Sequence, residues 1–214
     1  MKAVYLCLCM LAAFCFPAAA LPADCSQVIV GSADGWNSSH VQLSLLEKGP
    51  RGWVMVKGPF PARLGKSGLG GVYGTVPAPQ KKRSMPYRRI TPRDMWVDDP
   101  ASPLYNQHFV LKHDPVTPWE FKQQMKLNDY AHSLKLFIRH NAADGRQKPV
   151  PGAGSSIFFH IWRRDGGSPT AGCTAMSEEN LRAMIAWLDP SRHPLYILLP
   201  AREYLRLRRA WGLP

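Results

Sequence analysis

The chain has 214 residues, a formal net charge of +12 and 45% hydrophobic residues. This hydrophobic content excludes global disorder, and the length is enough for one sizeable core. The 20 prolines and 17 glycines predict many turns, which favours a β-rich domain over a helical bundle.

The first 20 residues have the pattern of a secretory signal peptide. Lys2 is the only charged side chain, an apolar run extends from Ala3 to Phe16, and residues 18–20 offer a small-residue cleavage site. An uncleaved membrane anchor is the alternative, although the run is short for a span of about 20 residues. We therefore expect export to the periplasm or cell envelope, with a single mature domain over 21–214.

Cleavage would remove three of the five cysteines and leave Cys25 and Cys173. Two cysteines do not form a disulfide scaffold, so either they pair or Cys173 stays reduced for chemistry. Cys25 would follow the new N-terminus by a few residues, where we expect a mobile region.

The mature chain would carry 26 basic and 15 acidic residues, a net charge of +11. No recognition helix or RNA-binding aromatic motif accompanies the basic clusters, so we expect no nucleic-acid partner. We interpret the charge as attraction to an anionic cell envelope, with a merely solvated basic surface as the alternative. We expect a monomer.

The local patterns predict a chain of short strands and three helices. Apolar and β-branched runs predict strands over 26–31, 41–46, 53–56, 95–97, 134–140, 156–162 and 195–199. The second and third of these flank a Gly/Pro turn and predict a hairpin. Capping and periodicity predict helices over 117–126, 177–188 and 201–211. The segments 76–107 and 141–154 are interpreted mainly as loops, and the Gly-rich segment 64–71 lacks phosphate-loop spacing.

The helix over 177–188 has the clearest signals. Ser177 is a suitable N-cap, and Met176 and Leu181 have the spacing of a hydrophobic staple. Leu181, Met184, Ile185 and Leu188 fall on one apolar face.

His160 and Cys173 are the candidate catalytic pair. In a strand over 156–162, His160 projects from the face opposite Phe159 and Ile161, which are expected to face the core. Cys173 lies in a turn four residues before the N-cap Ser177, where neighbouring amides, the helix end and an imidazole would favour a thiolate. The alternatives are a packed core histidine and a structural or disulfide-bonded cysteine.

The turn around Cys173 supplies further candidates. Gly172 allows close backbone approach to an acyl group, and amides from Cys173 to Thr174 could hold an oxyanion. The hydroxyls of Ser168 and Thr170 would lie beside the pocket. Four histidines, His108, His113, His132 and His140, show no metal-ligand spacing, so no metal is expected.

At these residues the chain resembles the L,D-transpeptidase (YkuD-type) catalytic domain family. The resemblance rests on the strand Pro151–His160 and on the turn Thr170–Cys173, which reads Thr-Ala-Gly-Cys. It extends upstream to residues 96–100 and to Tyr105 and Asn106, and covers about residues 30–200.

The resemblance implies a mainly β fold with a few helices, of the β-sandwich or barrel-like type. It also implies that Cys173 is the nucleophile and His160 the general base, acting on peptidoglycan stem peptides without a metal or organic cofactor. A terminal D-amino acid would be expelled after a diaminopimelate-type residue, and carbapenems would inhibit. Further candidate substrate contacts are Asp98, Asp99, Tyr105, Asn106 and Asn141. The alternative for Asp98 and Asp99 is an ordinary turn, and the alternative for Tyr105 and Asn106 is bracing of the loop.

The chain departs from the family pattern next to the nucleophile. Ala171 replaces a histidine, Thr174 and Ala175 replace an Ile/Val-Arg pair, and the loop from His160 to Cys173 is shorter. Arg163 or Arg164 could supply the missing cation. Three functions stay open: acyl transfer, hydrolysis of the same substrates, and non-catalytic binding to the cell wall.

Overall fold

The computed structural model describes residues 21–69, 73–75, 85–143 and 147–214. Its elements, in chain order, are β1 Gln27–Ala33, β2 His40–Gly49, β3 Gly52–Arg63, β4 Tyr73–Thr75, β5 Asp94–Trp96, β6 His108–Val110, α1 Pro118–Gln123, η1 Tyr130–His132, β7 Lys135–Phe137, β8 Phe158–Ile161, η2 Arg164–Gly166, β9 Thr174–Met176, α2 Glu178–Trp187, η3 Pro190–Arg192, β10 Leu195–Pro200 and α3 Ala201–Trp211. The mainly β fold class is therefore confirmed.

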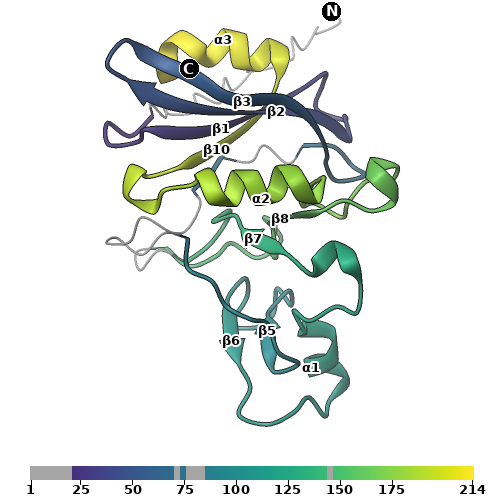
Figure 1. The fold of residues 1–214 in the computed structure, drawn as a ribbon. Coiled ribbons are helices and arrows are strands. Elements are labelled where there is room, and N and C mark those ends of the chain that lie inside the picture. Colours follow the sequence, from purple (N-terminus) through teal and green to yellow (C-terminus); the bar gives the residue numbers. More distant parts are fainter. Residues whose placement is uncertain (1–20, 70–72, 76–84, 144–146) are drawn as a thin grey trace, which may run out of the picture.

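Eight strands form one hydrogen-bonded sheet in the order β4-β10-β1-β2-β3-β9-β8-β7. The long strands β2 and β3 form the expected hairpin, and β10 pairs parallel with β1. The sheet narrows to one pair of residues where β3 meets β9, Arg63 opposite Ala175. This narrow link separates a large part, β4 to β3, from a small part of β9, β8 and β7 (Figure 1).

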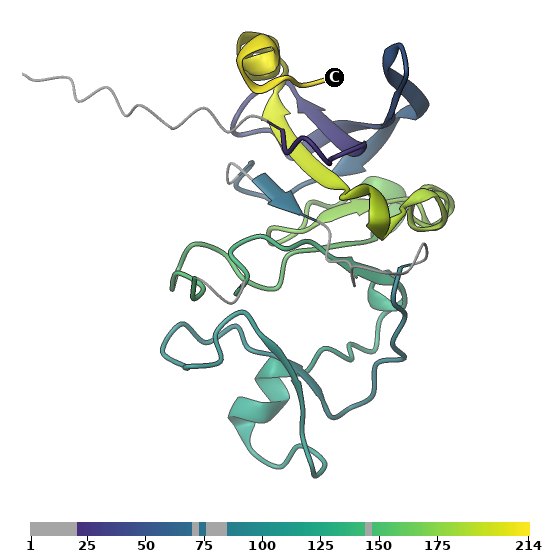
Figure 2. The ribbon, with the colours of Figure 1, turned by 90° about the vertical axis from the view of Figure 1, so that its left-hand side faces the viewer.

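The main core lies between these two parts of the sheet. Leu43 and Ile29 from the large part, Phe159 from β8, and Leu181 and Met184 from α2 are all in one buried apolar cluster. The packing is sandwich-like, and α2 lies beside it (Figures 1 and 2). The opposite face of β1 and β10 packs against α3 through a second cluster that includes Val28, Ile197 and the partly buried Trp211.

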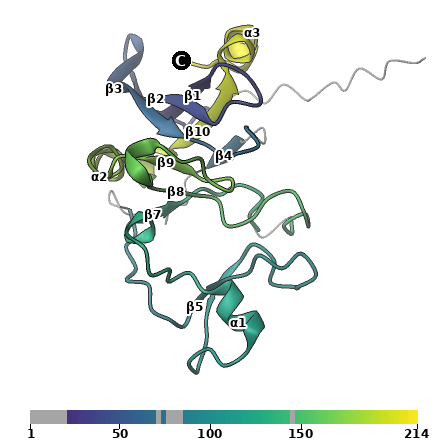
Figure 3. The same ribbon diagram turned by 90° about the vertical axis from the view of Figure 1, so that its right-hand side faces the viewer.

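A smaller lobe lies below the small part of the sheet in Figure 1. It contains the two-stranded sheet of β5 and β6 together with α1 (Figures 1 and 3). Its buried Asp94 accepts hydrogen bonds from Arg88 and Thr91 and contacts His108. The lobe also provides Trp96, which packs edge-on against Phe158 of β8. This aromatic contact joins the lobe to the face of β8 that lies away from the main core.

The predicted elements are mostly present but shorter in the middle of the chain. The helix expected over 117–126 ends at Gln123, and the strand expected over 134–140 is limited to Lys135–Phe137. Thr117 caps α1 with the full capping box. The strand β6 was not predicted, because its three residues lack a distinctive pattern.

The cap and staple predicted for α2 are both present. Ser177 accepts a hydrogen bond from the amide of Asn180, and Met176 and Leu181 are fully buried in the main core. The strands β7 and β9, which flank β8, have three residues each. Strands this short have little stability alone. We infer that packing of α2 is what stabilises the small part of the sheet against the large part.

We therefore expect Leu181→Ala to lower the free energy of unfolding by about 2–5 kcal/mol, because it leaves a cavity in the centre of the core. Arg182→Ala is the matched control. Its side chain is 64% exposed and pairs with Glu178 one turn away, so its loss should change the free energy by less than about 1 kcal/mol. Urea unfolding followed by circular dichroism measures both, and equal effects would contradict this description of the core.

Candidate functional site

The pairing of β8 with β9 places His160 and Cys173 on one face of the sheet. The two strands run parallel, with His160 opposite Ala175. Residues paired across strands project to the same side, and so do residues two apart on one strand. Cys173, two residues before Ala175, is therefore a diagonal neighbour of His160 on the face away from the main core. The loop of Trp162–Gly172 provides the crossover that parallel strands require.

The expected contribution of the α2 helix end is wrong. Between Cys173 and the first residue of the helix, Glu178, the chain forms the extended strand β9. At roughly 3.3 Å per residue, this strand carries the helix N-terminus about 10 Å or more from the thiol. The effect of a helix dipole is confined to its terminal turn, so it does not activate Cys173.

His160 is buried, with 2% of its surface exposed. Its Nδ1 lies 2.7 Å from the backbone carbonyl oxygen of Ile161, which only accepts hydrogen bonds. The proton is therefore on Nδ1, and Nε2 carries the free lone pair. Burial lowers the pKa of His160 from 6.5 to about 4, against a smaller raising effect from the Ile161 carbonyl. A neutral imidazole with a fixed tautomer suits the role of general base.

The thiol of Cys173 is partly buried and donates a hydrogen bond to the backbone carbonyl of Ser156, at 3.4 Å, rather than to His160. Burial raises the pKa of Cys173, and a backbone hydrogen bond at Phe158 and the charges of Lys135 and Arg163 offset this only in part. The expectation of a stabilised thiolate is therefore wrong for the resting protein. Both members of the pair are neutral at pH 7.

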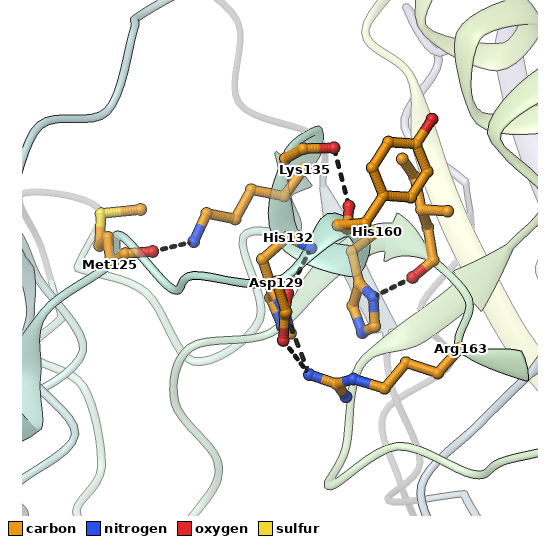
Figure 4. Close-up of polar contacts among 9 residues, drawn as sticks. Met125, Asp129, His132, Lys135, His160 and Arg163 are labelled. Atoms are coloured by element: carbon orange, nitrogen blue, oxygen red, sulfur yellow. Dashed lines mark hydrogen bonds and ion pairs between the residues drawn. The ribbon is translucent and has the colours of Figure 1, made fainter.

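Behind His160 lies a second histidine that the sequence analysis did not place in the site. The ring of His132 stacks on that of His160, with centroids 4.6 Å apart. Asp129 accepts hydrogen bonds from Nδ1 of His132 and from Arg163, at 2.7 and 2.6 Å (Figure 4). Burial alone would raise the pKa of Asp129, but the bonds from Arg163 and His132 lower it to about 2. These three residues hold the outer side of the imidazole in place.

Thr170 closes the nucleophile turn. Its Oγ1 donates to the carbonyl of Cys173 at 2.6 Å and accepts from the amide of Gly172 at 3.1 Å. Its backbone pairs with the Gly-rich segment through Leu64 and Lys66. At Gly65 a Cβ atom would lie 3.2 Å from the Cα of Gly172, so a side chain there would press against the nucleophile turn. The Gly-rich segment thus supports the turn.

The other residues predicted for the turn have different surroundings. The side chain of Thr174 faces the core, where its hydroxyl lies 3.1 Å from that of Tyr196. Only its backbone could therefore contribute to an oxyanion site. Gly172 is exposed beside Cys173, and Ser168 is partly buried in the crossover loop.

Asn106 braces Ser156, the residue whose carbonyl contacts the thiol. It is buried in the left-handed conformation, with φ of 53°. Its Oδ1 accepts from the indole of Trp96 and from the amide of Ser156, and its Nδ2 donates to the carbonyls of His140 and Asn141. The bracing alternative therefore describes Asn106 in this structure.

Of the other candidate substrate contacts, Asn141 and Tyr105 have structural roles, Asp99 lies outside the site, and Asp98 lies near Cys173. Asn141 holds the loop at Val150 and Gly154, and Tyr105 is buried in the turn before Asn106. Asp99 accepts from the indole of Trp119 on α1, outside the site. Asp98 is nearer, because it bonds to Ser155 and its charge raises the pKa of Cys173.

A cavity of about 860 Å³ lies around β7, between this strand and the lobe, and its lining includes Phe158 of β8 but neither His160 nor Cys173. Basic and aromatic side chains line it, including Arg88, Trp96, Lys135 and Phe158, and His132 lies at its edge. The described part of the chain contains no cluster of three or more His, Cys, Asp or Glu side chains that could hold a metal ion.

The sequence analysis expected Cys25 in a mobile region, and this expectation is wrong. It is 1% exposed in the cluster beneath α3, and burial raises its pKa to about 11. Both cysteines in the part of the chain that the structure describes, Cys25 and Cys173, are free thiols. The predicted signal peptide lies outside the described residues. Within those residues no helix combines the length and the apolar character needed to cross a membrane.

Comparison with known proteins gives one match. The family model YkuD, the L,D-transpeptidase catalytic domain, matches residues 54–197, which is more than half of the chain. Neither the curated proteins nor the solved structures contain a match. The matched range includes both His160 and Cys173.

The burial of His160 predicts a pH dependence of stability. Its folded pKa, about 4, lies below the unfolded value of 6.5, so between these values the unfolded chain binds the extra proton and stability falls as the pH falls. From pH 7 to pH 5 the loss from this group is about 2 kcal/mol. His160→Gln should remove this part of the slope in urea unfolding measured at both pH values. An unchanged slope would show that His160 is not a buried neutral imidazole.

Proposed function

Since the chain belongs to the L,D-transpeptidase catalytic domain family, we propose that it is an exported cysteine-dependent acyltransferase acting on peptidoglycan stem peptides. Cys173 is the nucleophile and His160 the general base. The observation that carries this proposal is the β8–β9 register, which puts both side chains on one face, with Nδ1 of His160 bound to Ile161 and Nε2 free.

The reaction begins with a neutral thiol and a neutral imidazole. A thiolate–imidazolium pair is unfavourable at rest, because burial raises the pKa of Cys173 and lowers that of His160. Proton transfer from Sγ to Nε2 therefore accompanies attack of Sγ on the scissile carbonyl carbon. We expect backbone amides of the turn, such as that of Cys173, to stabilise the resulting oxyanion.

The low pKa of His160 also suits the second half of the step. The imidazolium formed during attack is a strong acid, so it readily gives its proton to the leaving nitrogen as the C–N bond breaks. The products are a thioester on Cys173 and a free terminal D-amino acid. An amine of another stem peptide then takes the acyl group and regenerates the thiol, whereas attack by water would give a trimmed stem peptide.

Charge supports a location at the cell envelope. The mature chain carries an excess of 11 basic residues, and basic side chains such as Arg88 and Lys135 line the cavity around β7. Stem peptides and envelope polymers are anionic, so this excess favours encounter with them.

We expect the mature protein, residues 21–214, to convert purified muropeptides into products that mass spectrometry identifies. Cross-linked dimers indicate transfer, and trimmed monomers indicate hydrolysis. Cys173→Ala should reduce either product by at least about 1000-fold, and His160→Gln by about 100- to 10,000-fold.

Cys25→Ala is the matched control, because Cys25 lies in the separate cluster beneath α3, and it should retain activity. Products that form at the wild-type rate in Cys173→Ala would contradict the proposal. Binding of muropeptides without any product would indicate the non-catalytic alternative.

A further inference from the structure

Four residues, one on each of β7, β8, β9 and β3, pair side by side in a row that includes His160. Lys135 on β7 pairs with His160 on β8, His160 pairs with Ala175 on β9, and Ala175 pairs with Arg63 at the end of β3. Cross-strand partners project to the same face. Two cationic side chains, Lys135 and Arg63, therefore flank His160 and Ala175 on the face that carries Cys173.

The burial pattern independently supports this placement of Arg63. Phe60, Ala62 and Leu64 are buried in the main core, so the alternating residue Arg63 projects from the other face. On β9, Met176 faces the same core, and Ala175 therefore shares the face of Arg63.

Arg63 differs from the other cations near the pair because no acceptor for it lies among the residues that the structure describes. Arg163 is bound to Asp129, and Nζ of Lys135 donates to the carbonyl of Met125. Nε of Arg63 is buried and has no hydrogen-bond partner within the ranges that the structure describes. Arg63 has no carboxylate within ion-pair distance in those ranges either. A buried donor without a partner is unfavourable, and it marks a place where a ligand could supply the acceptor.

The position of Arg63 relative to Cys173 fits one residue of substrate. Cys173 is the diagonal neighbour of Arg63 across the antiparallel pair of β3 and β9, and such neighbours lie roughly 7–8 Å apart. One extended residue spans about 3.3–3.6 Å. A carboxylate one residue beyond the scissile carbonyl therefore falls between Cys173 and the side chain of Arg63.

The two sides of the pair differ in the room that they offer. The cavity lies on the β7 side, towards Lys135 and the lobe, and has space for the longer acyl part of a peptide. Arg63 lies on the opposite side, towards β3, where the short terminal residue would extend. A guanidinium is suited to this end, because two of its N–H groups bind both oxygens of a carboxylate.

We propose that Arg63 binds the terminal carboxylate of the amino acid that the reaction releases, and so restricts the enzyme to the free C-terminal end of its peptide substrate. This inference rests on the proposed function, since it assumes that Cys173 attacks the last amide bond of a stem peptide. Arg63 is a specificity-determining residue that contacts the substrate, and it takes no part in proton transfer.

The test uses the mature protein with two muropeptide stem peptides that differ only at the C-terminus, a free carboxylate in one and a carboxamide in the other. Arg63→Gln should lower kcat/KM for the carboxylate peptide by about 10- to 100-fold. It should leave kcat/KM for the carboxamide peptide unchanged, because that peptide lacks the charge which Arg63 binds. Arg63→Lys, which keeps the charge without the fork, should lose less than Arg63→Gln on the carboxylate peptide.

Arg51→Gln is the matched control, because Arg51 is exposed in the hairpin turn at the other end of β3, and it should behave as wild type. Equal loss on both peptides in Arg63→Gln, or no loss, would overturn the inference while wild-type activity stands. If Arg63→Gln does not fold, the same comparison in Arg63→Lys decides. A wild-type protein that consumes neither peptide would instead refute the proposed function, and the inference with it.

Discussion

The site depends on the parallel pairing of β8 with β9. Each strand is only three or four residues long, yet their register places a histidine and a cysteine from either side of an irregular loop on one face. The other face of the same strands is buried in the main core through Phe159, Ile161 and Met176. A slip of one residue would move His160 into that core. Core packing therefore fixes the register of β8 and β9, and this register places His160 and Cys173 on the same face.

Burial then decides where the protons are. Burial keeps the imidazole of His160 neutral, the bond to Ile161 fixes its tautomer, and burial of Cys173 favours the thiol. The mechanism proposed above therefore starts from a neutral pair. In that proposal, the cost of charging two buried groups is the physical reason that attack and proton transfer share one step. The nearby cations Lys135 and Arg163 reduce the cost of charging Cys173 without removing it.

Much of the fold could be predicted from local sequence signals. The cap at Ser177, the staple of Met176 and Leu181 and the alternation around His160 each depend on neighbouring residues, and all have the predicted form. The supporting residues Asp129, His132 and Lys135 could not be predicted, because they reach His160 through cross-strand pairing and loop packing. The expected effect of the helix end on Cys173 was wrong for a similar reason. The sequence analysis took the residues before Ser177 as a turn, whereas they form the strand β9. Arg63 could not be assigned to the site from the sequence, because only its pairing with Ala175 places it there.

The most direct measurement is intact-protein and peptide mass spectrometry after brief exposure to a carbapenem or a stem tetrapeptide, at several pH values between 6 and 9. We predict one covalent acyl adduct, located on Cys173, which forms at least about 100-fold more slowly in His160→Gln. Since the resting thiol is protonated, the rate in the wild-type protein should depend on the neutral imidazole of His160. Formation of the adduct at the same rate without His160, or on another residue, would contradict the account.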